Sequence, residues 1–525
     1  MKRIPLYPFA FVSFVVLALH AANFRFDHGI GIRSLIILNI AAGISFKAFR
    51  YFGKDRQTVA YYAFNLFIFI LFYGQFHVTI IEKADFFSEA TLQFIIPAVW
   101  IFFQGAAILG WHKSSTRKLI TEALSATCFV ALFVSFLRIG SLNYQENHYY
   151  NNFQGYKSPQ FLTPVEEFEL KGSNPPDIYY LILDGYGRKD VLSEIYGYDN
   201  QPFLDYLSQR GFYIANQSHS NYIQTPMSIA SSLNLNYILP QVEPRLLMLK
   251  QTNILRDNIK NNIVISSLKE RGYTTIAFDS GFFHTVNPDV DLYITKFVEI
   301  NVFEQVLVAN TPLGIFPELF DNVPMFTFTT HRERIDYSLE QFNHIPSNPS
   351  PKFVFLHLVI PHPPFVYDRE GNPIQPKRVM GLLDGSDFLG DVEDYRIGYV
   401  DQMIYLNEIL KKTVDNILIQ SATPPIIIIQ GDHGPGSMLN WDSVDSTCHW
   451  ERISILNAYY FPDQDYSDLA NNISPVNTFR IVFNHFFGTE FEILENKAFY
   501  TTDRQLFGQV DVTSELASSA GCSIP

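Results

Sequence analysis

An acid and a histidine stand side by side directly after a strongly apolar run. Pro424–Ser437 has the sequence PPIIIIQGDHGPGS, and its four isoleucines indicate a strand buried on both faces, as in a parallel sheet. Ligands of open α/β sheets bind beyond the carboxyl ends of the strands, where Asp432 and His433 follow. Carboxylate and neutral imidazole are common ligands of zinc and manganese. The pair predicts a metal site; the alternative is a turn-capping Asp432 and a solvated His433.

A second acid follows an earlier apolar strand. The stretch Asp177–Leu183 (DIYYLIL) ends at Asp184-Gly185, which again places a carboxylate at a strand end. Further strands and helices alternate along the chain, and this alternation predicts an α/β fold with a mainly parallel sheet covered by helices. The expected helices are 201–209, one after Thr225, 263–271 and about 395–419, and the expected strands are 177–183, 275–278, 353–359 and 426–430.

Thr225 and Pro226 form a helix-start signal. A hydroxyl at the N-cap followed by proline at the first helical position is favoured, because the missing proline N–H costs nothing there. The unpaired N–H groups of such a helix attract anions, so a phosphate could bind beside the Thr225 hydroxyl. The alternative is that Thr225 is only a cap.

Histidines also lie near the ends of other expected strands. His362 stands in the rigid turn Ile360-Pro-His-Pro-Pro-Phe365, and His284 follows the strand 275–278. Either could bind substrate or be a satisfied loop residue. His357, in the middle of a strand, is interpreted as a buried structural histidine. His449 and Arg452 come after the Asp432-His433 loop, and they could face the same cleft or the solvent.

The first 140 residues have the composition of a membrane domain. Apolar runs lie at about 4–22, 32–49, 59–81, 91–111 and 119–138, most of them near the ~20 residues that cross a bilayer. Up to Arg138 there are 13 Lys and Arg against 6 Asp and Glu, and the remainder has 25 against 46, within a net charge of −14. The acidic remainder excludes nucleic acid as its ligand, because phosphate contacts need a basic face.

Five spans with the N-terminus inside place nine basic residues in cytoplasmic loops and three in the opposite loops, the arrangement that the positive-inside rule favours. Everything after residue 140 then lies outside the cytoplasm. The expected domains are a five-helix transmembrane domain (1–140), a juxtamembrane connector (141–172) and an extracytoplasmic catalytic domain (173–525). Cys128 falls in the fifth run, which leaves Cys448 and Cys522 as the one pair able to form a disulfide.

The order of these motifs resembles the alkaline phosphatase superfamily and, within it, the sulfatase-like branch. With a five-span N-terminal bundle, the whole chain is similar to membrane-anchored phosphotransferases such as lipoteichoic acid synthases and lipid A phosphoethanolamine transferases. The resemblance implies an alkaline-phosphatase-like fold in which Asp184, Asp432, His433 and Thr225 hold one divalent metal ion. The ion is manganese or zinc, with magnesium also compatible and a second ion left open. Asp184 departs from the glutamate that this branch often has.

The resemblance also implies roles for the remaining residues and a reaction. Thr225 is the nucleophile, and His362 and His284 contact the substrate phosphate. A phosphoglycerol or phosphoethanolamine group would pass from a phospholipid donor, through a phospho-threonine, to an envelope glycan or lipid, on the outer face of a bacterial cytoplasmic membrane. The alternatives are a phosphodiesterase or phosphatase with the same site, a sulfatase, and a catalytically silent membrane scaffold. Sulfatases place a modifiable Cys or Ser in a C/S-x-P-x-R context, and Gln224–Ser228 (QTPMS) has neither that residue nor the arginine.

Overall fold

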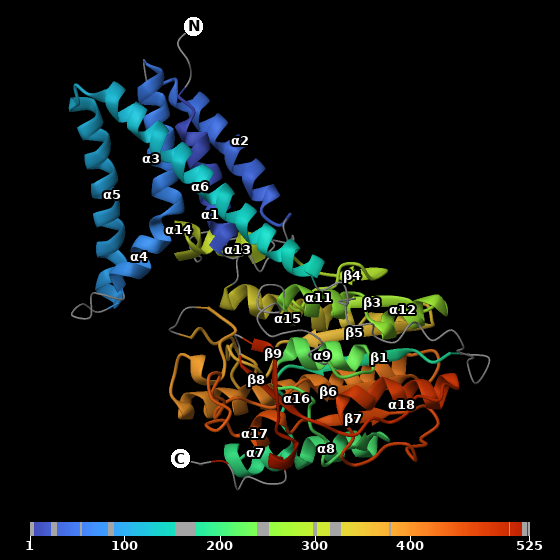
Figure 1. The fold of residues 1–525 in the computed structure, drawn as a ribbon. Coiled ribbons are helices and arrows are strands. Elements are labelled where there is room, and N and C mark those ends of the chain that lie inside the picture. The colour runs from blue at the N-terminus through green and yellow to red at the C-terminus, as the bar shows by residue number, and fades with distance from the viewer. Residues whose placement is uncertain are drawn as a thin grey trace. The chain divides into compact units, whose positions relative to one another are not determined.

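The computed structural model describes residues 5–22, 29–52, 55–81, 89–152, 175–238, 251–297, 302–315, 327–376, 380–502, 505–516 and 522. The chain divides into two compact units (Figure 1). Unit 1 comprises residues 1–154 and 299–325, and unit 2 comprises residues 155–298 and 326–525.

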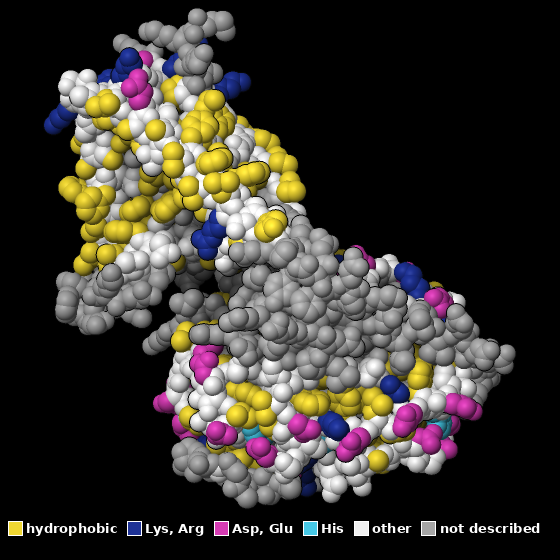
Figure 2. Space-filling view, viewed as in Figure 1, with side chains coloured by type: hydrophobic (Ala, Val, Ile, Leu, Met, Phe, Trp, Pro, Cys, Tyr) yellow, Lys and Arg dark blue, Asp and Glu magenta, His cyan; other side chains and the backbone are white. Residues whose placement is uncertain are grey.

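Unit 1 is helical. Three of its helices are long and apolar enough to cross a membrane: residues 32–49, 94–113 and 117–144. Side chains of Ile36, Ile40 and Ile44 recur every four residues on one exposed face of the first of these, and Figure 2 shows hydrophobic side chains spread over the surface of this unit. The helices are α1 (Tyr7–Ala22), α2 (Ile32–Phe49), α3 (Arg56–Leu71), α4 (Tyr73–Ile81), α5 (Glu89–Lys113) and α6 (Arg117–Asn152).

This arrangement supports the expected five spans only roughly. α1 has 16 residues, and the expected span 59–81 is broken at Phe72 between α3 and α4. Beside the break, the N–H of Gly74 donates to the carbonyl of Asn310 over 2.8 Å, and a Cβ on Gly74 would lie 2.6 Å from the Cα of Asn310. The close approach of a second backbone accompanies the interruption of the helix. α6 continues to Asn152, into the expected connector, and residues 153–174 lie outside the described residues.

A segment from the second half of the sequence belongs to unit 1. It contains α13 (Val302–Ala309) and α14 (Pro312–Ile315). Phe303 is fully buried, with its ring beside Gly31, and Leu307 joins the apolar core formed by α1, α2 and α3. Glu304 forms an ion pair with Arg33. The polypeptide therefore passes from one unit to the other at three places in the sequence.

Unit 2 is built on a seven-stranded sheet with the order β2-β7-β6-β1-β5-β3-β4. The pairs β6-β1, β1-β5, β5-β3 and β3-β4 are parallel. The pairs β6-β7 and β7-β2 are antiparallel, so β7 alone runs against the other strands. The mainly parallel α/β sheet is therefore confirmed. The strands are β1 (Ile178–Leu183), β2 (Tyr213–Ile214), β3 (Thr274–Phe278), β4 (Leu292–Ile294), β5 (Lys352–Leu358), β6 (Ile426–Gly431) and β7 (Asn457–Tyr460); β8 (Phe499–Thr502) and β9 (Gln505–Asp511) form a separate hairpin.

Helices cover both faces of this sheet, and alternation along β1 decides which side chains each face receives. Tyr180 and Ile182 pack on one face, whereas Tyr179 and Leu181 pack on the other. Helices on the first face are α9 (Thr225–Leu233), α11 (Gln251–Lys260), α12 (Ile263–Glu270) and α18 (Pro475–Phe487); those on the second are α8 (Gln201–Gln209), α15 (Phe328–Phe342) and α16 (Val392–Gln420). Short helices α7 (Lys189–Tyr196) and α17 (His449–Ile453) and the 3-10 turns 345–347, 385–387 and 513–515 complete the unit.

The register of the three central strands aligns their carboxyl ends. Leu183, the last residue of β1, pairs with Leu358 of β5 and with Gly431 of β6. The residues that follow these strands consequently emerge at one edge of the sheet.

A buried ion pair joins the opposite ends of the same strands. Nζ of Lys352 lies 2.5 Å from Oδ2 of Asp177, and both side chains are fully buried. The backbone N–H of Lys352 also donates to Oδ1 of Asp177 over 3.0 Å, so the carboxylate fixes the start of β5 beside β1.

Replacing Asp177 by alanine would leave the Lys352 ammonium buried without its counter-charge. We expect Asp177→Ala to lower the free energy of unfolding by about 3–5 kcal/mol, seen as a lower melting temperature of the detergent-solubilised chain. Glu495→Ala is the control, since it breaks only an exposed pair with Lys497. Equal melting temperatures for the two variants would contradict the role assigned to the buried pair.

Candidate active site

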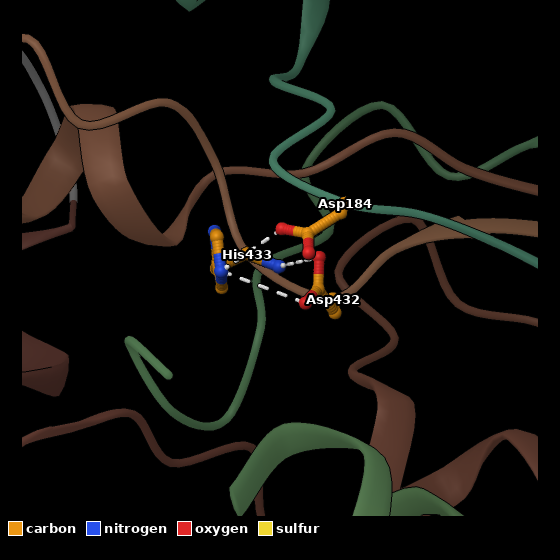
Figure 3. Close-up of side chains that lie close together, drawn as sticks. All are labelled: Asp184, Asp432 and His433. Atoms are coloured by element: carbon orange, nitrogen blue, oxygen red, sulfur yellow. Dashed lines mark hydrogen bonds and ion pairs between the residues drawn. The ribbon is translucent and has the colours of Figure 1, made fainter. Parts of the chain in front are cut away.

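Asp184, Asp432 and His433 converge at the carboxyl edge of the sheet (Figure 3). Asp184 follows β1, and the other two follow β6. Nε2 of His433 lies 3.4 Å from Oδ1 of Asp184 and 3.5 Å from Oδ2 of Asp432. One ligand atom from each residue lies within 4.8 Å of the other two, and all three side chains are buried. The structure thus brings together three residues that are up to 249 positions apart in the sequence.

Hydrogen bonds set the tautomer of His433. Its Nδ1 lies 2.9 Å from the carbonyl oxygen of Gly434, so this nitrogen carries the proton and donates it to that acceptor. The lone pair is left on Nε2, which faces the two carboxylates. Burial, and then the positive charge of Arg452, lower the pKa of His433, which favours the neutral ring that binds metals.

The two carboxylates fit a divalent cation. Oδ1 of Asp432 accepts from the N–H groups of Gly185 and His433, each over 3.0 Å. Oδ2 of Asp432 and Oδ1 of Asp184 are buried and accept no hydrogen bond from any residue that the structure describes. Burial alone would raise the pKa of Asp184, but the nearby imidazoles of His362, His357 and His433 hold its pKa well below the ordinary value. Two carboxylates with unsatisfied oxygens facing an imidazole lone pair form a donor set suited to zinc or manganese.

Thr225 brings a hydroxyl to the same nitrogen. Its Oγ1 lies 3.1 Å from Nε2 of His433, and the side chain is buried. The expected cap position was wrong by one residue: Gln224 is the N-cap of α9, it makes no side-chain cap hydrogen bond, and Thr225 is the first helical residue. The Thr225 hydroxyl is accordingly directed at His433.

His362 reaches the cluster through the turn that follows β5. Its N–H donates to the carbonyl of Asp184 over 3.0 Å, its Nδ1 lies 2.5 Å from the carbonyl oxygen of Pro363, and its ring centroid is 6.1 Å from that of His433. His284 is placed differently. Its ring packs beside Phe282 and Phe283, burial lowers its pKa to about 3, and no hydrogen bond or ion pair within the described residues joins it to the cluster.

The two residues left open on α17 have different surroundings. Nη2 of Arg452 lies 3.2 Å from Nε2 of His433, so Arg452 belongs to the cluster. The ring of His449 is buried against Tyr500, and its Nε2 lies 3.1 Å from the carbonyl oxygen of Val444. Within the described residues, no contact of His449 reaches Asp184, Asp432 or His433.

Two further residues take part that sequence reasoning did not place there. His357 is buried, as expected, but its Nε2 lies 3.4 Å from Oδ2 of Asp184 and its Nδ1 lies 2.9 Å from the hydroxyl of Thr285. Asp384 is buried and bonds Arg452. No local signal separates Asp384 from the neighbouring acids Asp387 and Asp391, whereas a histidine in the middle of a buried strand could have been recognised as a candidate.

Comparison with solved structures gives distant matches. The C-terminal periplasmic domain of EcEptC from Escherichia coli, in complex with Zn, has 13% identity and a TM-score of 0.44, covering 69% of this chain and 99% of that one. The lipooligosaccharide phosphoethanolamine transferase A (EptA) of Neisseria meningitidis has 13% identity and a TM-score of 0.37, covering 91% and 93%. The lipoteichoic acid synthase LtaP of Listeria monocytogenes has 12% identity and a TM-score of 0.35, covering 58% and 68%. These values assign no substrate.

No curated protein matches the chain. The sulfatase family model, in contrast, matches residues 176–478, which is more than half of the 525 residues. This match spans the central strands of unit 2 and every residue of the cluster described above. The chain belongs to the sulfatase family and is an enzyme of that family.

Proposed function

We propose that this enzyme is a membrane-anchored, metal-dependent transferase that moves a phosphoglycerol or phosphoethanolamine group from a phospholipid to an envelope glycan or lipid. One observation carries the proposal: the hydroxyl of Thr225 lies 3.1 Å from a nitrogen that also faces two buried carboxylates. A threonine hydroxyl is a weak nucleophile at neutral pH and needs activation. The cluster supplies the donor atoms for a cation that would activate it.

Asp184, Asp432, His433 and Thr225 would hold the ion, which is zinc or manganese, with magnesium also compatible. When bound, the ion would lower the pKa of the hydroxyl and neutralise charge on the phosphoryl oxygens. Within the described residues only this group of carboxylates and histidines is close enough to hold a metal, and a second ion is left open.

The residues themselves account for the transfer. The Oγ1 of Thr225 attacks phosphorus, a P–O bond forms on the threonine, and the P–O bond to the lipid glycerol breaks. The proton of the hydroxyl ends on the released diacylglycerol. Attack by an acceptor hydroxyl then breaks the phospho-threonine bond, and its proton restores Thr225. His362 and Arg452 lie beside His433, which the Thr225 hydroxyl also contacts, and there they would contact the phosphoryl oxygens.

A hydrolase with the same site is the second candidate, because water in place of the acceptor hydroxyl would complete a phosphodiesterase cycle. Sulfate-ester hydrolysis is disfavoured, because the first residue of α9 is a threonine and not the modifiable cysteine or serine of sulfatases. The apolar helices of unit 1 favour transfer from a donor that itself lies in a membrane.

The catalytic unit is proposed to lie outside the cytoplasm of a bacterium. Cys448 and Cys522 are joined by a disulfide, a bond that persists in oxidising compartments and is rare in the cytosol. The distribution of basic residues in the first 140 positions, with the N-terminus inside, supports the same placement.

Removing the nucleophile should abolish turnover. We expect Thr225→Ala to lower the rate of headgroup release from a labelled phospholipid by about 10³-fold or more. Thr225→Ser keeps a hydroxyl and should retain measurable activity. Chromatography of the products separates labelled glycan or lipid from free headgroup, and thus transferase from hydrolase. Equal rates for wild type and Thr225→Ala would remove the assignment of the nucleophile.

Removing one ligand should remove the metal without unfolding the protein. We expect Asp432→Ala to lose bound metal, measured by plasma emission on the purified chain, while its melting temperature stays within a few degrees of the metal-free wild type. Burial of the strands, rather than the ion, supplies most of the stability. The matched control is Asp387→Asn, an exposed acid on unit 2. Metal content equal to that of wild type in Asp432→Ala would count against the site.

A reporter fusion tests the placement of the catalytic unit. Alkaline phosphatase fused after Leu170 should be active, because that reporter folds only where its disulfides form. A fluorescent protein that matures only in the cytoplasm, fused at the same position, should be dark. The reverse pattern would place the catalytic unit inside.

A further inference from the structure

Arg452 and Asp384 form a buried pair beside the candidate metal ligands. Both side chains are 2% exposed, and the carboxylate accepts from Nη1 of the guanidinium. Burial alone would raise the pKa of Asp384, but Arg452 and His362 hold its pKa at about 2, so the pair is ionic. Removing one partner from such a pair leaves the other charge uncompensated.

Three of the five N–H donors of Arg452 have fixed acceptors outside the candidate metal ligands. Nε donates to the carbonyl of Ile223 over 2.9 Å, and Nη1 donates to Asp384 and, over 3.2 Å, to the carbonyl of Gly434. The guanidinium carbon lies 5.5 Å from the ring centroid of Trp441. The group is held on several sides, and Nη2 is the nitrogen directed at His433.

The acceptor of Nη2 is the lone pair that a metal ion would use. Because Nδ1 of His433 donates to Gly434, Nε2 has a single lone pair. Nη2 of Arg452 lies 3.2 Å from Nε2 and shares this lone pair with the hydroxyl of Thr225, which lies 3.1 Å away. A lone pair that binds a cation no longer accepts a hydrogen bond. Metal loading would therefore leave a buried, charged N–H without its acceptor, and such a group binds an anion strongly.

Asp384 fixes this arrangement from the other side. Its Oδ1 accepts from the hydroxyl of Tyr395 over 2.8 Å, and its Oδ2 lies 3.5 Å from Nε2 of His362. A Cβ on Gly436 would lie 2.6 Å from Oδ1, so the carboxylate is packed tightly against the loop that follows His433. Asp384 thus contacts Arg452 and His362, the two residues that would meet a phosphoryl group. Within the described residues it forms no hydrogen bond with the four proposed metal ligands.

We infer that Asp384 is a positioning residue for the phosphoryl subsite: it holds Arg452 so that metal binding at His433 releases an Nη2–H for a phosphoryl oxygen. The inference rests on the proposed function for the identity of the anion. If the inference holds, the metal ion raises the affinity for the anion in two ways: by direct attraction between their opposite charges, and by freeing an N–H of Arg452. Asp384 is therefore needed for the coupling between metal binding and anion binding, but not for metal binding itself.

The test measures binding of inorganic phosphate to the detergent-solubilised full chain by calorimetry, with zinc bound and after chelation. Asp384→Asn should keep the metal content of wild type and weaken phosphate binding by about 10-fold or more in the zinc form. The loss should be smaller in the chelated form, where Nη2 stays on His433. The control Asp387→Asn, in the same turn but exposed, should bind phosphate as wild type does.

A double-mutant cycle separates positioning from a general structural role. If Asp384 acts through Arg452, Asp384→Asn in an Arg452→Gln background should change phosphate affinity by less than about 3-fold. Additive losses would overturn the inference, as would an unchanged affinity or a lost metal in Asp384→Asn alone. Should Asp384→Asn not fold, Tyr395→Phe loosens the same carboxylate; it should weaken phosphate binding at equal metal content, and an unchanged affinity would overturn the inference.

The same preparations distinguish this inference from the proposed function. Metal-coupled phosphate binding that depends on Asp384, in a wild-type chain that transfers no headgroup, would sustain the inference and remove the transferase. Headgroup transfer by wild type, together with phosphate binding that does not change in Asp384→Asn, would sustain the transferase and overturn the inference.

Discussion

Two carboxylates buried at the end of a parallel sheet impose the main electrostatic constraint on unit 2. The ligand oxygens of Asp184 and Asp432 lie within 4.8 Å of each other, and two like charges at that separation would repel each other by about 3 kcal/mol at an effective dielectric constant of about 20. Asp184 and Asp432 are nevertheless fixed by strands that cannot slip, since a one-residue shift would turn apolar side chains toward the wrong face. Imidazoles, backbone N–H groups and an arginine surround the carboxylates and partly offset this charge. A divalent cation would balance it.

A second layer of polar groups surrounds the cluster of Asp184, Asp432 and His433. His357 contacts Asp184 from the neighbouring strand, and Asp384 contacts Arg452 and His362 from a loop. Glu451 is also buried, and it accepts from the hydroxyls of Tyr196 and Ser437. Hydrogen bonds of this kind make an ionic network tolerable away from water. Within the described residues, Oδ1 of Asp184, Oδ2 of Asp432 and Nε2 of His357 have no hydrogen-bond partner.

The central sheet and the primary cluster could be predicted because both depend on short-range patterns. Runs such as Ile426–Ile429 identify strands buried on both faces, and an acid at a strand end is placed by the sheet itself. Positions that depend on long-range packing could not be predicted. Asp384 enters from a loop with no periodicity, Arg452 was left open between cleft and solvent, and the break at Phe72 accompanies a contact with Asn310, far away in the sequence. The one-residue error at Thr225 arose because a local cap rule competes with a tertiary partner.

The segment 299–325, which interrupts the sequence of unit 2, belongs to unit 1. Phe303 and Leu307 bury their side chains among α1, α2 and α3, and Glu304 neutralises Arg33 there. A truncated fragment that begins ahead of β1 would carry these apolar side chains into water, where they invite aggregation. The chain thus contributes to the helical unit twice, first through residues 1–154 and again through residues 299–325, which lie within the sequence of unit 2.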